Sequence, residues 1–345
     1  MSFQPIPLQD LLAAAQDGGG FAVQAEMPVL VLHADWHTQG LSQLEASRLS
    51  AWLRQQPRPT LAIASTHSGP SLAEACDVQV ATIQEAIPLA AHITHSPLAA
   101  MVLVQLLRIT ETMPLADGLI AESLAYSTLQ AGPEFRRWLA AHPPQATPPD
   151  DDGAAVLMQR DNDTLKLQLN RPRQHNAMSV EMRDALMEAL QLVLADESIT
   201  NVRLSGLGKC FSTGGELREF GTAPDPATAH WVRSLALPGR LLARCAARVE
   251  VRVHGACIGS GIEFPAFAAR VVAAPDAYFQ LPELQFGLIP GAGGCISIAR
   301  RIGRQRTAWL ALSGQRIDAK TALNWGLVDG IEDTPETHSH PSRPE

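Results

Sequence analysis

Short runs of alternating or continuous hydrophobic residues recur through the second half of the chain. They predict strands at 165–170, 201–207, 249–257, 269–275 and 277–283. The intervening segment 179–196 has helical spacing, and Ser179 is its predicted N-cap. Strands that alternate with helices predict an α/β layered architecture.

The first half has the same pattern in shorter elements. Strands are predicted at 28–35, 59–66 and 78–83, with helices at 41–56 and 71–77. From Ser96 to His142 the spacing is purely helical and gives no strand signal. We therefore expect a small α/β region followed by a helical region.

A segment rich in proline and aspartate separates the two halves. The stretch HPPQATPPDDDG, which ends at residue 153, contains four prolines and three consecutive aspartates. Such a sequence forms neither helix nor strand, so it predicts a linker over 143–153. The residues 334–345 have a similar composition and predict a flexible tail.

Composition excludes several classes of protein. Of the 345 residues, 46% are hydrophobic and 18% charged, which excludes a mainly disordered chain. The net charge is −8 and the basic residues are scattered, so we expect neither a nucleic-acid nor a membrane partner. No apolar run reaches the roughly 18 residues of a membrane span. No basic residue precedes Arg48, so we expect no signal peptide and a cytoplasmic location.

Several common motifs are absent or incomplete. The five cysteines include no CxxC pair, which argues against a disulfide framework or a zinc site. The segment GLGK at 206–209 lacks the other residues of a phosphate-binding loop. No HExxH and no strand-associated GxGxxG occurs, so we expect no bound metal or dinucleotide.

Four segments of the second half fit one kind of chemistry. They are NRPRQHNAM (170–178), GKCFSTGGEL (208–217), HGACIGSGIEF (254–264) and FQLPELQFGLIPGAGG (279–294). Their glycine-rich turns can offer backbone N–H groups to a carbonyl oxygen that gains negative charge. Glu263 and Glu283 add two carboxylates for acid–base work. Each feature also has a plain structural interpretation: a turn, a helix-dipole partner or an exposed loop charge.

Together, in this order and spacing, the four segments resemble the crotonase superfamily, also called the enoyl-CoA hydratase/isomerase family. They are similar to its NRPxxxNAL, AFSAGADL, NGxAxGGGxE and QPExxxGxxPGxGG motifs, and 310–331 is similar to a later family segment. The resemblance covers roughly residues 160–333. It implies a spiral core of ββα turns at 154–333 and an acyl-CoA thioester substrate.

The resemblance also implies roles for individual residues. Residues that match its catalytic positions are Glu263, Glu283, Gly215, Ser260 and Gly291. Residues that match its substrate-binding positions are Arg173, Thr213, Gly214, Glu216 and Leu217. The expected cofactor is none beyond the coenzyme A of the substrate, and the expected assembly is a homo-oligomer, a trimer or hexamer.

Some positions depart from the family pattern. Ser260 replaces the middle glycine of GGG, so a hydroxymethyl group enters near the thioester. Pro265 follows Glu263 and removes a helical hydrogen bond. Ala269 stands where the family has aspartate, and Thr213 and Glu216 also differ from its usual residues. These departures leave the substrate and the rate open.

The first half of the chain, over residues 1–94, resembles a degenerate partial copy of the same fold. Residues 59–82 are similar to a family segment, but Ser71 stands where Glu263 stands in the second copy. Residues 95–142 resemble the C-terminal helices that cover the site and mediate trimers in the family. We expect them to pack on the 154–333 core, in the same chain or in a neighbouring one.

The function that the resemblance implies is hydration of a 2-enoyl-CoA. One carboxylate would take a proton from water as it attacks C3, and the other would serve C2. Alternatives are double-bond isomerisation or thioester hydrolysis by the same superfamily, or a non-catalytic acyl-CoA-binding subunit.

Overall fold

The computed structural model describes residues 6–16, 27–34, 41–64, 72–143 and 153–333. These residues form two compact units. Unit 1 comprises Met1–Trp138, Pro282–Ile289 and Gly303–Gln315, and unit 2 comprises Leu139–Leu281, Pro290–Ile302 and Arg316–Glu345. Two segments from the predicted 154–333 core are therefore grouped with the N-terminal residues.

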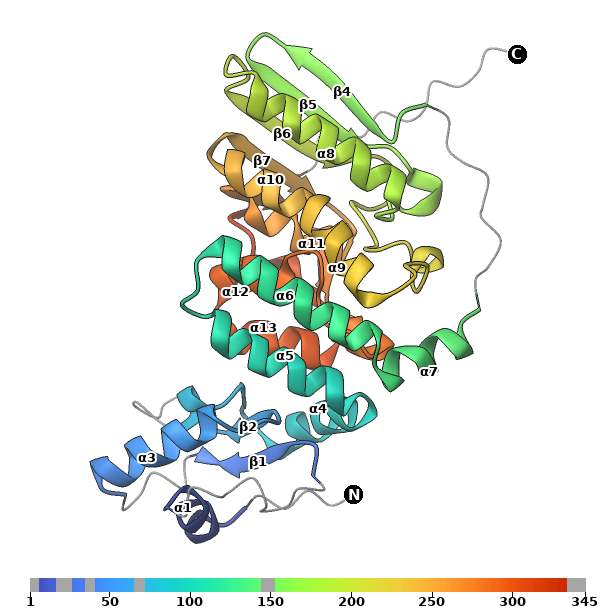
Figure 1. The fold of residues 1–345 in the computed structure, drawn as a ribbon. Helices are drawn as coiled ribbons and strands as arrows, with labels where there is room; N and C mark the ends of the chain where they lie inside the picture. Colours follow the sequence, from blue (N-terminus) through green and yellow to red (C-terminus); the bar gives the residue numbers. More distant parts are fainter. Residues whose placement is uncertain (1–5, 17–26, 35–40, 65–71, 144–152, 334–345) are drawn as a thin grey trace. The chain divides into compact units, whose positions relative to one another are not determined.

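Unit 2 is an α/β structure built on two sheets (Figure 1). The larger sheet has the order β12-β9-β7-β6-β5-β4, and the smaller has the order β11-β10-β8. The strands are β4 (Val156–Asp161), β5 (Thr164–Leu169), β6 (Asn201–Gly206), β7 (Val249–Val253), β8 (Ala256–Ile258), β9 (Arg270–Ala273), β10 (Tyr278–Gln280), β11 (Ile317–Asp318) and β12 (Gly330–Ile331). The helices are α8 (Val180–Ala195), α9 (Pro226–Leu235), α10 (Pro238–Cys245), α11 (Ser260–Glu263), α12 (Gly294–Ile302) and α14 (Ala319–Trp325). Short 3₁₀ turns are η2 (Pro172–Gln174), η3 (Leu217–Glu219), η4 (Ala246–Arg248) and η5 (Pro265–Phe267).

The larger sheet follows the sequence pattern closely. Strand β5 alternates half-buried and buried residues, and it pairs in parallel with β6 and antiparallel with β4. Ser179 caps α8, its side chain accepting a hydrogen bond from the backbone N–H of Met182. Helices α8 and α10 pack side by side in Figure 1. The α/β prediction is confirmed.

The predicted strand 249–257 is in fact two strands in different sheets. Gly255, between β7 and β8, has a φ of +54°, which favours glycine. A side chain there would also collide with the carbonyl of Lys209. The alternating pattern runs on through this corner, so periodicity alone missed it. This bend sends β8 into the smaller sheet, where its end leads into α11.

Unit 1 contains a three-stranded parallel sheet, with the order β1-β2-β3, and mostly helical segments. Its strands are β1 (Leu30–His33), β2 (Thr60–Ile63) and β3 (Val78–Val80). Its helices are α1 (Leu8–Gln16), α3 (Gln43–Arg54), α4 (Ile83–His95), α5 (Pro97–Thr110), α6 (Leu115–Gln130), α13 (Arg304–Ser313) and the first part of α7 (Pro133–Ala141), with 3₁₀ turns η1 (Leu72–Ala75) and η6 (Glu283–Phe286). The helix predicted at 71–77 is only the short turn η1.

A buried charge cluster holds unit 1 together. The carboxylate of Asp77, 1% exposed, pairs with Arg108 of α5 and, at 3.1 Å, with Arg304 of α13. It also accepts hydrogen bonds of 2.9 Å from the backbone N–H and the hydroxyl of Thr60. The cluster therefore joins the small sheet, the helical region and a segment more than 200 residues away in sequence.

Helices of unit 1 contact segments from the second half of the same chain. Helices α4 and α5 both contact α13, and α4 contacts η6. The carboxylate of Glu134 accepts the backbone N–H groups of Leu98 and Ala99 at the start of α5, at 2.8 and 3.0 Å. Gly287 lies so close to Glu134 that an added Cβ would be 2.5 Å from the Cβ of Glu134.

Some expectations fall outside the described residues. These are Ser71, most of the linker at 143–153, and the tail at 334–345. Within the described residues, no single helix is long and apolar enough to span a membrane. Helices α4 and α5 meet that criterion only as a pair, and they are bent by 108° relative to each other.

Candidate active site

The first part of the candidate site is the glycine pair after β6. Gly214 has a φ of +93°, and an added Cβ would lie 2.8 Å from the carbonyl oxygen of Ile258. Only glycine lets this loop lie directly on the end of β8. The pairing of Ser212 with Cys257 fixes the same register. The sequence therefore brings the GG loop against the turn that precedes Ser260.

The backbone N–H of Gly215 is available as a donor. Met178 donates its N–H to the carbonyl of Gly214 at 2.7 Å, and Glu216 donates its own to the carbonyl of Met178 at 3.2 Å. These two bonds flank Gly215 in a parallel bridge, so its own N–H faces away from Met178. No acceptor for this N–H lies among the described residues.

The second donor is the first N–H of α11. Gly259 has a φ of +51° and a ψ of −124°, a conformation that favours glycine, and it redirects the chain into the helix. The N–H groups of Ile262 and Glu263 bond to the Gly259 carbonyl, while that of Ser260 has no acceptor in the described part of the chain. Gly215 and Ser260 thus offer two unbonded amides on segments that contact each other.

Glu263 is the buried acid of this region, 2% exposed. Its carboxylate accepts the backbone N–H groups of Ala292 at 2.7 Å and Gly294 at 3.0 Å, and also that of Gly291. A Cβ on Gly294 would lie 2.5 Å from Cγ of Glu263. The PGAGG turn is therefore folded around this side chain. Because Gly294 begins α12, the carboxylate of Glu263 also lies at the N-terminus of that helix, where it interacts favourably with the helix dipole.

Burial dominates the protonation of Glu263. Removal from water raises the pKa of its carboxyl to about 7, although the three backbone N–H groups act in the opposite direction. No ion pair to Glu263 occurs among the residues that the structure describes. A carboxyl with this pKa can both give and take a proton near neutral pH.

Glu283, the other predicted catalytic acid, belongs to unit 1. It begins η6 and is 9% exposed. Its backbone carbonyl accepts the N–H of Leu288 at 3.0 Å, and Gly287 closes the turn with a φ of +70°. Glu283 is thus a buried carboxylate within unit 1, and not the exposed loop charge that its sequence context also allowed.

The predicted substrate-binding residues occupy two neighbouring loops of unit 2. Arg173 is exposed on η2, and Leu217 is 48% exposed at the start of η3. Thr213 donates its N–H to the carbonyl of His175, which joins the loops. The carboxylate of Glu216 pairs with Arg218, whose hydrogen bond lowers the pKa of Glu216. Glu216 therefore caps η3.

Asn176 is a site-building residue whose role sequence reasoning missed. It is fully buried, its side-chain oxygen accepts the N–H of Arg171, and its amide donates to the carbonyls of Leu207 and Cys210. It holds the RPR loop against the GLGK loop and so supports the GG turn. Its place inside the NRPRQHNAM motif was the available signal.

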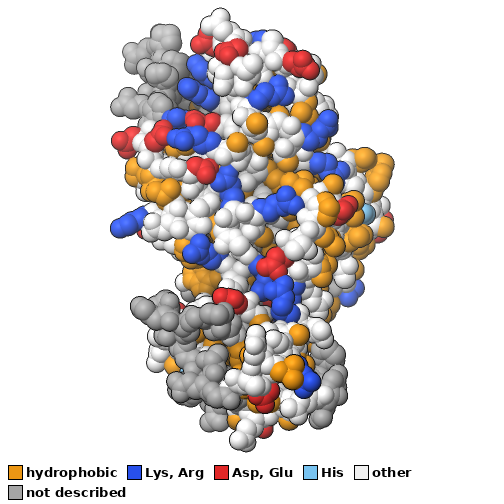
Figure 2. Space-filling view, turned by 90° about the vertical axis from the view of Figure 1, so that its left-hand side faces the viewer, with side chains coloured by type: hydrophobic (Ala, Val, Ile, Leu, Met, Phe, Trp, Pro, Cys, Tyr) orange, Lys and Arg blue, Asp and Glu red, His pale blue; other side chains and the backbone are white. Residues whose placement is uncertain are grey.

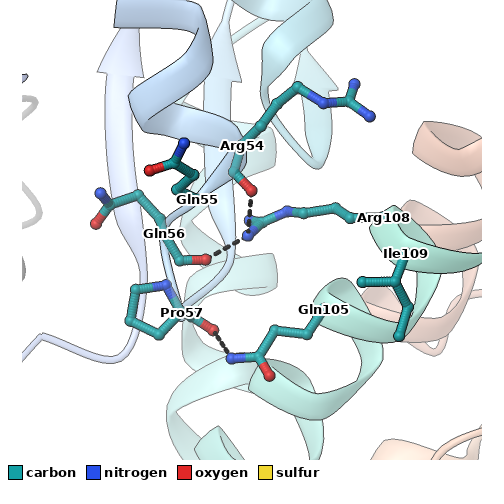
Figure 3. A pocket seen from close by; sticks show the side chains of 7 residues that line it. All are labelled: Arg54, Gln55, Gln56, Pro57, Gln105, Arg108 and Ile109. Atoms are coloured by element: carbon teal, nitrogen blue, oxygen red, sulfur yellow. Dashed lines mark hydrogen bonds between the residues drawn. The ribbon is translucent and has the colours of Figure 1, made fainter.

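A pocket of about 410 Å³ in unit 1 offers a different kind of surface (Figure 3). Arg108 donates there to the backbone carbonyls of Arg54 and Gln56, and the Gln105 amide donates to the carbonyl of Pro57. The remaining donors of Arg108 bind Asp77 and the carbonyl of Arg58. The polar groups of this pocket hold the end of α3, so it is a structural junction.

Comparisons with known proteins agree with the motifs. The sequence profile of the enoyl-CoA hydratase/isomerase family matches residues 159–340. The chain is 31% identical over 182 residues to the 2,3-dehydroadipyl-CoA hydratase of Escherichia coli. This match covers 51% of this chain and 68% of that protein. It is 32% identical to the 1,2-epoxyphenylacetyl-CoA isomerase of the same organism, over 52% of this chain and 70% of that protein.

Solved structures include similar chains. The crystal structure of an enoyl-CoA hydratase from Thermoplasma volcanium is 30% identical, with a TM-score of 0.48. The match covers 53% of this chain and 73% of that one.

Among the described residues there is no cluster of three or more His, Cys, Asp or Glu side chains that could hold a metal ion.

Proposed function

Because the chain belongs to the enoyl-CoA hydratase/isomerase family, we propose that it hydrates a 2-enoyl-CoA thioester. The single observation that carries this proposal is the pair of unbonded amides at Gly215 and Ser260, the latter on the same short helix as the buried Glu263, the pKa of which burial raises to about 7. Such donors stabilise the negative charge that develops on a thioester oxygen.

The proposed reaction divides the work between backbone and side chains. The two amides hold the thioester oxygen as it becomes enolate-like. One carboxylate takes a proton from water while the water oxygen bonds to C3, and the C2–C3 double bond becomes the enolate. A carboxylic acid then returns a proton to C2, which regenerates the thioester carbonyl. Glu263 and Glu283 are the proposed carboxylates, and coenzyme A enters only as part of the substrate.

Incubation with a panel of 2-enoyl-CoA thioesters tests this proposal. We expect at least one of them to gain the mass of one water, at a rate that depends on enzyme concentration. E263Q is the matched variant, because it keeps the shape of the side chain and removes its proton exchange. No water addition by the wild-type enzyme to any member of the panel would overturn the proposal.

Isomerisation of an enoyl-CoA is the second candidate, and the match to the enoyl-CoA hydratase/isomerase family supports it. Moving a double bond requires proton transfers at two carbons but no bound water, so one carboxylate can suffice. Activity that survives E283Q with unchanged substrate mass would favour isomerisation. Release of free coenzyme A would favour thioester hydrolysis, and tight binding of thioesters without turnover would favour a non-catalytic subunit.

We also propose a homo-oligomer, a trimer or hexamer. The supporting observation is a set of exposed aliphatic side chains on helices of unit 1: Ile87, Leu98, Ile109, Ile120 and Leu124. Figure 2 shows hydrophobic side chains exposed on one face of the molecule. Large exposed hydrophobic surfaces mark interaction sites. Sedimentation equilibrium of the wild type and of L124E tests this, and a monomeric wild type would refute it.

A further inference from the structure

The hydroxyl of Ser260 is an unusual group in the described part of unit 2. Ser260 is 6% exposed, its Oγ is closed off from solvent, and that Oγ has no hydrogen-bond partner among the described residues. Buried hydroxyls in folded proteins nearly always have a partner, so an orphan needs an explanation. Neither bulk water nor a described neighbour provides one here.

Neighbouring buried serines show the usual behaviour. The Ser212 hydroxyl donates to the carbonyl of Asn176 at 2.8 Å and accepts the N–H of Gly214 at 3.2 Å. The Ser297 hydroxyl donates to the carbonyl of Glu263 at 2.6 Å. The local fold thus satisfies the hydroxyls that it uses for structure. The hydroxyl at position 260 is outside that network, so the fold does not depend on it.

The position of this hydroxyl makes it relevant to the proposed chemistry. Covalent geometry places a serine Oγ about 3 Å from its own backbone nitrogen. The backbone N–H of Ser260 is one of the two unbonded amides. A single acceptor atom can therefore receive both donors of this residue. The next residue, Gly261, has no room for a side chain because a Cβ would collide with the Ser212 carbonyl, so position 260 alone in this pair can carry such a group.

We propose that the Ser260 hydroxyl is a third hydrogen-bond donor to the thioester oxygen, beside the amides of Gly215 and Ser260. This inference rests on the proposed acyl-CoA chemistry and adds a side-chain donor to it. The hydroxyl donates as charge builds on the oxygen, and no covalent bond to serine forms. Its effect is greater on the enolate-like state than on the bound substrate, because only the former carries full charge.

Two substitutions test the role of the hydroxyl. S260A removes the hydroxyl and keeps the backbone N–H, and S260G also removes the methylene. We expect kcat to fall about 100-fold in both, with a smaller change in KM, as for the loss of one oxyanion donor. The melting temperature of S260A should stay at or above that of the wild type, because an unbonded buried hydroxyl is removed. S205A, at a half-buried serine of β6, is the control and should keep the wild-type kcat.

A binding experiment separates this inference from the proposed function. Acetoacetyl-CoA forms an enolate that absorbs in the ultraviolet, so bound enolate can be followed without turnover. We expect the wild type to convert more of the bound ligand to enolate than S260A does. If the wild type turns over enoyl-CoA and S260A or S260G matches or exceeds its kcat, the inference is overturned while the function stands. If the wild type neither turns over a thioester nor binds the enolate, the proposed function itself fails.

Discussion

Two regions of this chain surround a buried acid with opposite kinds of partner. In unit 1, Asp77 precedes β3 and lies between the guanidinium groups of Arg108 and Arg304. In unit 2, Glu263 ends α11 and its carboxylate accepts backbone N–H groups of the PGAGG turn. One acid is paired with cations, and the other only with amides.

The difference in partners suits Asp77 to a structural role and Glu263 to proton transfer. Asp77 is paired with two guanidinium groups from different helices, so it joins elements of unit 1 together. Backbone amides do not fully offset the burial of Glu263, so its pKa rises to about 7 and it can exchange a proton.

The largest expected effect is on the chemistry of Glu263 in unit 2. E263Q removes proton exchange but keeps an oxygen that can accept the same N–H groups. We expect kcat for the enoyl-CoA substrate to fall about 10²–10⁴-fold, with little change in melting temperature. Steady-state kinetics measure this, with E188Q on the exposed face of α8 as the control. An E263Q variant with wild-type kcat would remove the distinction between the two acids.

Removal of the buried acid of unit 1 should instead affect stability. D77A leaves Arg108 and Arg304 buried without their carboxylate, which should destabilise the protein by about 3–5 kcal/mol. Urea unfolding measures it. R160A breaks an exposed pair with Asp196 and should change stability by no more than about 1 kcal/mol. Equal losses in D77A and R160A would show that the buried cluster is not what holds unit 1 together.

A smaller effect is expected from a substitution that displaces the carboxylate of Glu263. G294A places a Cβ 2.5 Å from Cγ of Glu263 and 2.8 Å from its Oε2, so the acid must move. A displacement of this kind should lower kcat about 10- to 100-fold. G330A is the matched control, because no atom lies closer than 3.8 Å to its added Cβ. Full activity in both variants would show that the reaction does not depend on the position of the Glu263 carboxylate.

The smallest expected effect is the pH dependence of stability. The folded pKa of Glu263, about 7, lies above its ordinary value of 4.5, so the folded state holds a proton that the unfolded state has lost between these values. The favourable contribution is complete below about pH 4.5 and is lost as the pH rises through 7. We expect the stability of the wild type relative to E263Q to decline across this window. A difference that is flat with pH would contradict the raised pKa.

The sequence was sufficient for the strands and helices whose periodicity is local. Strands β5 and β6 and helix α8 with its Ser179 cap were predicted close to their observed bounds. The first strand of the hairpin, β4, was missed, because five of its six residues are exposed and the run gives no alternation. Helix α4 was also missed; it carries Pro88 in its interior, a residue type that usually ends or kinks a helix.

The candidate site could be predicted only as a set of motifs. The motifs name Gly215, Ser260 and Glu263 as candidates, but the closure of Ala292 and Gly294 on Glu263 joins residues about 30 positions apart and leaves no local pattern. The grouping of 282–289 and 303–315 with unit 1 is non-local in the same way, because Arg304 pairs with Asp77 and η6 contacts α4. Motif spacing indicates which residues are candidates for catalysis, whereas tertiary packing determines their burial and their hydrogen-bond partners.

The most direct test is a crystal structure of the wild-type protein with acetoacetyl-CoA. The account predicts that the thioester oxygen lies about 2.7–3.1 Å from the backbone nitrogens of both Gly215 and Ser260. It also predicts that the acyl group lies beside the carboxylate of Glu263. A thioester bound with its oxygen on other donors, or turned away from Glu263, would contradict it.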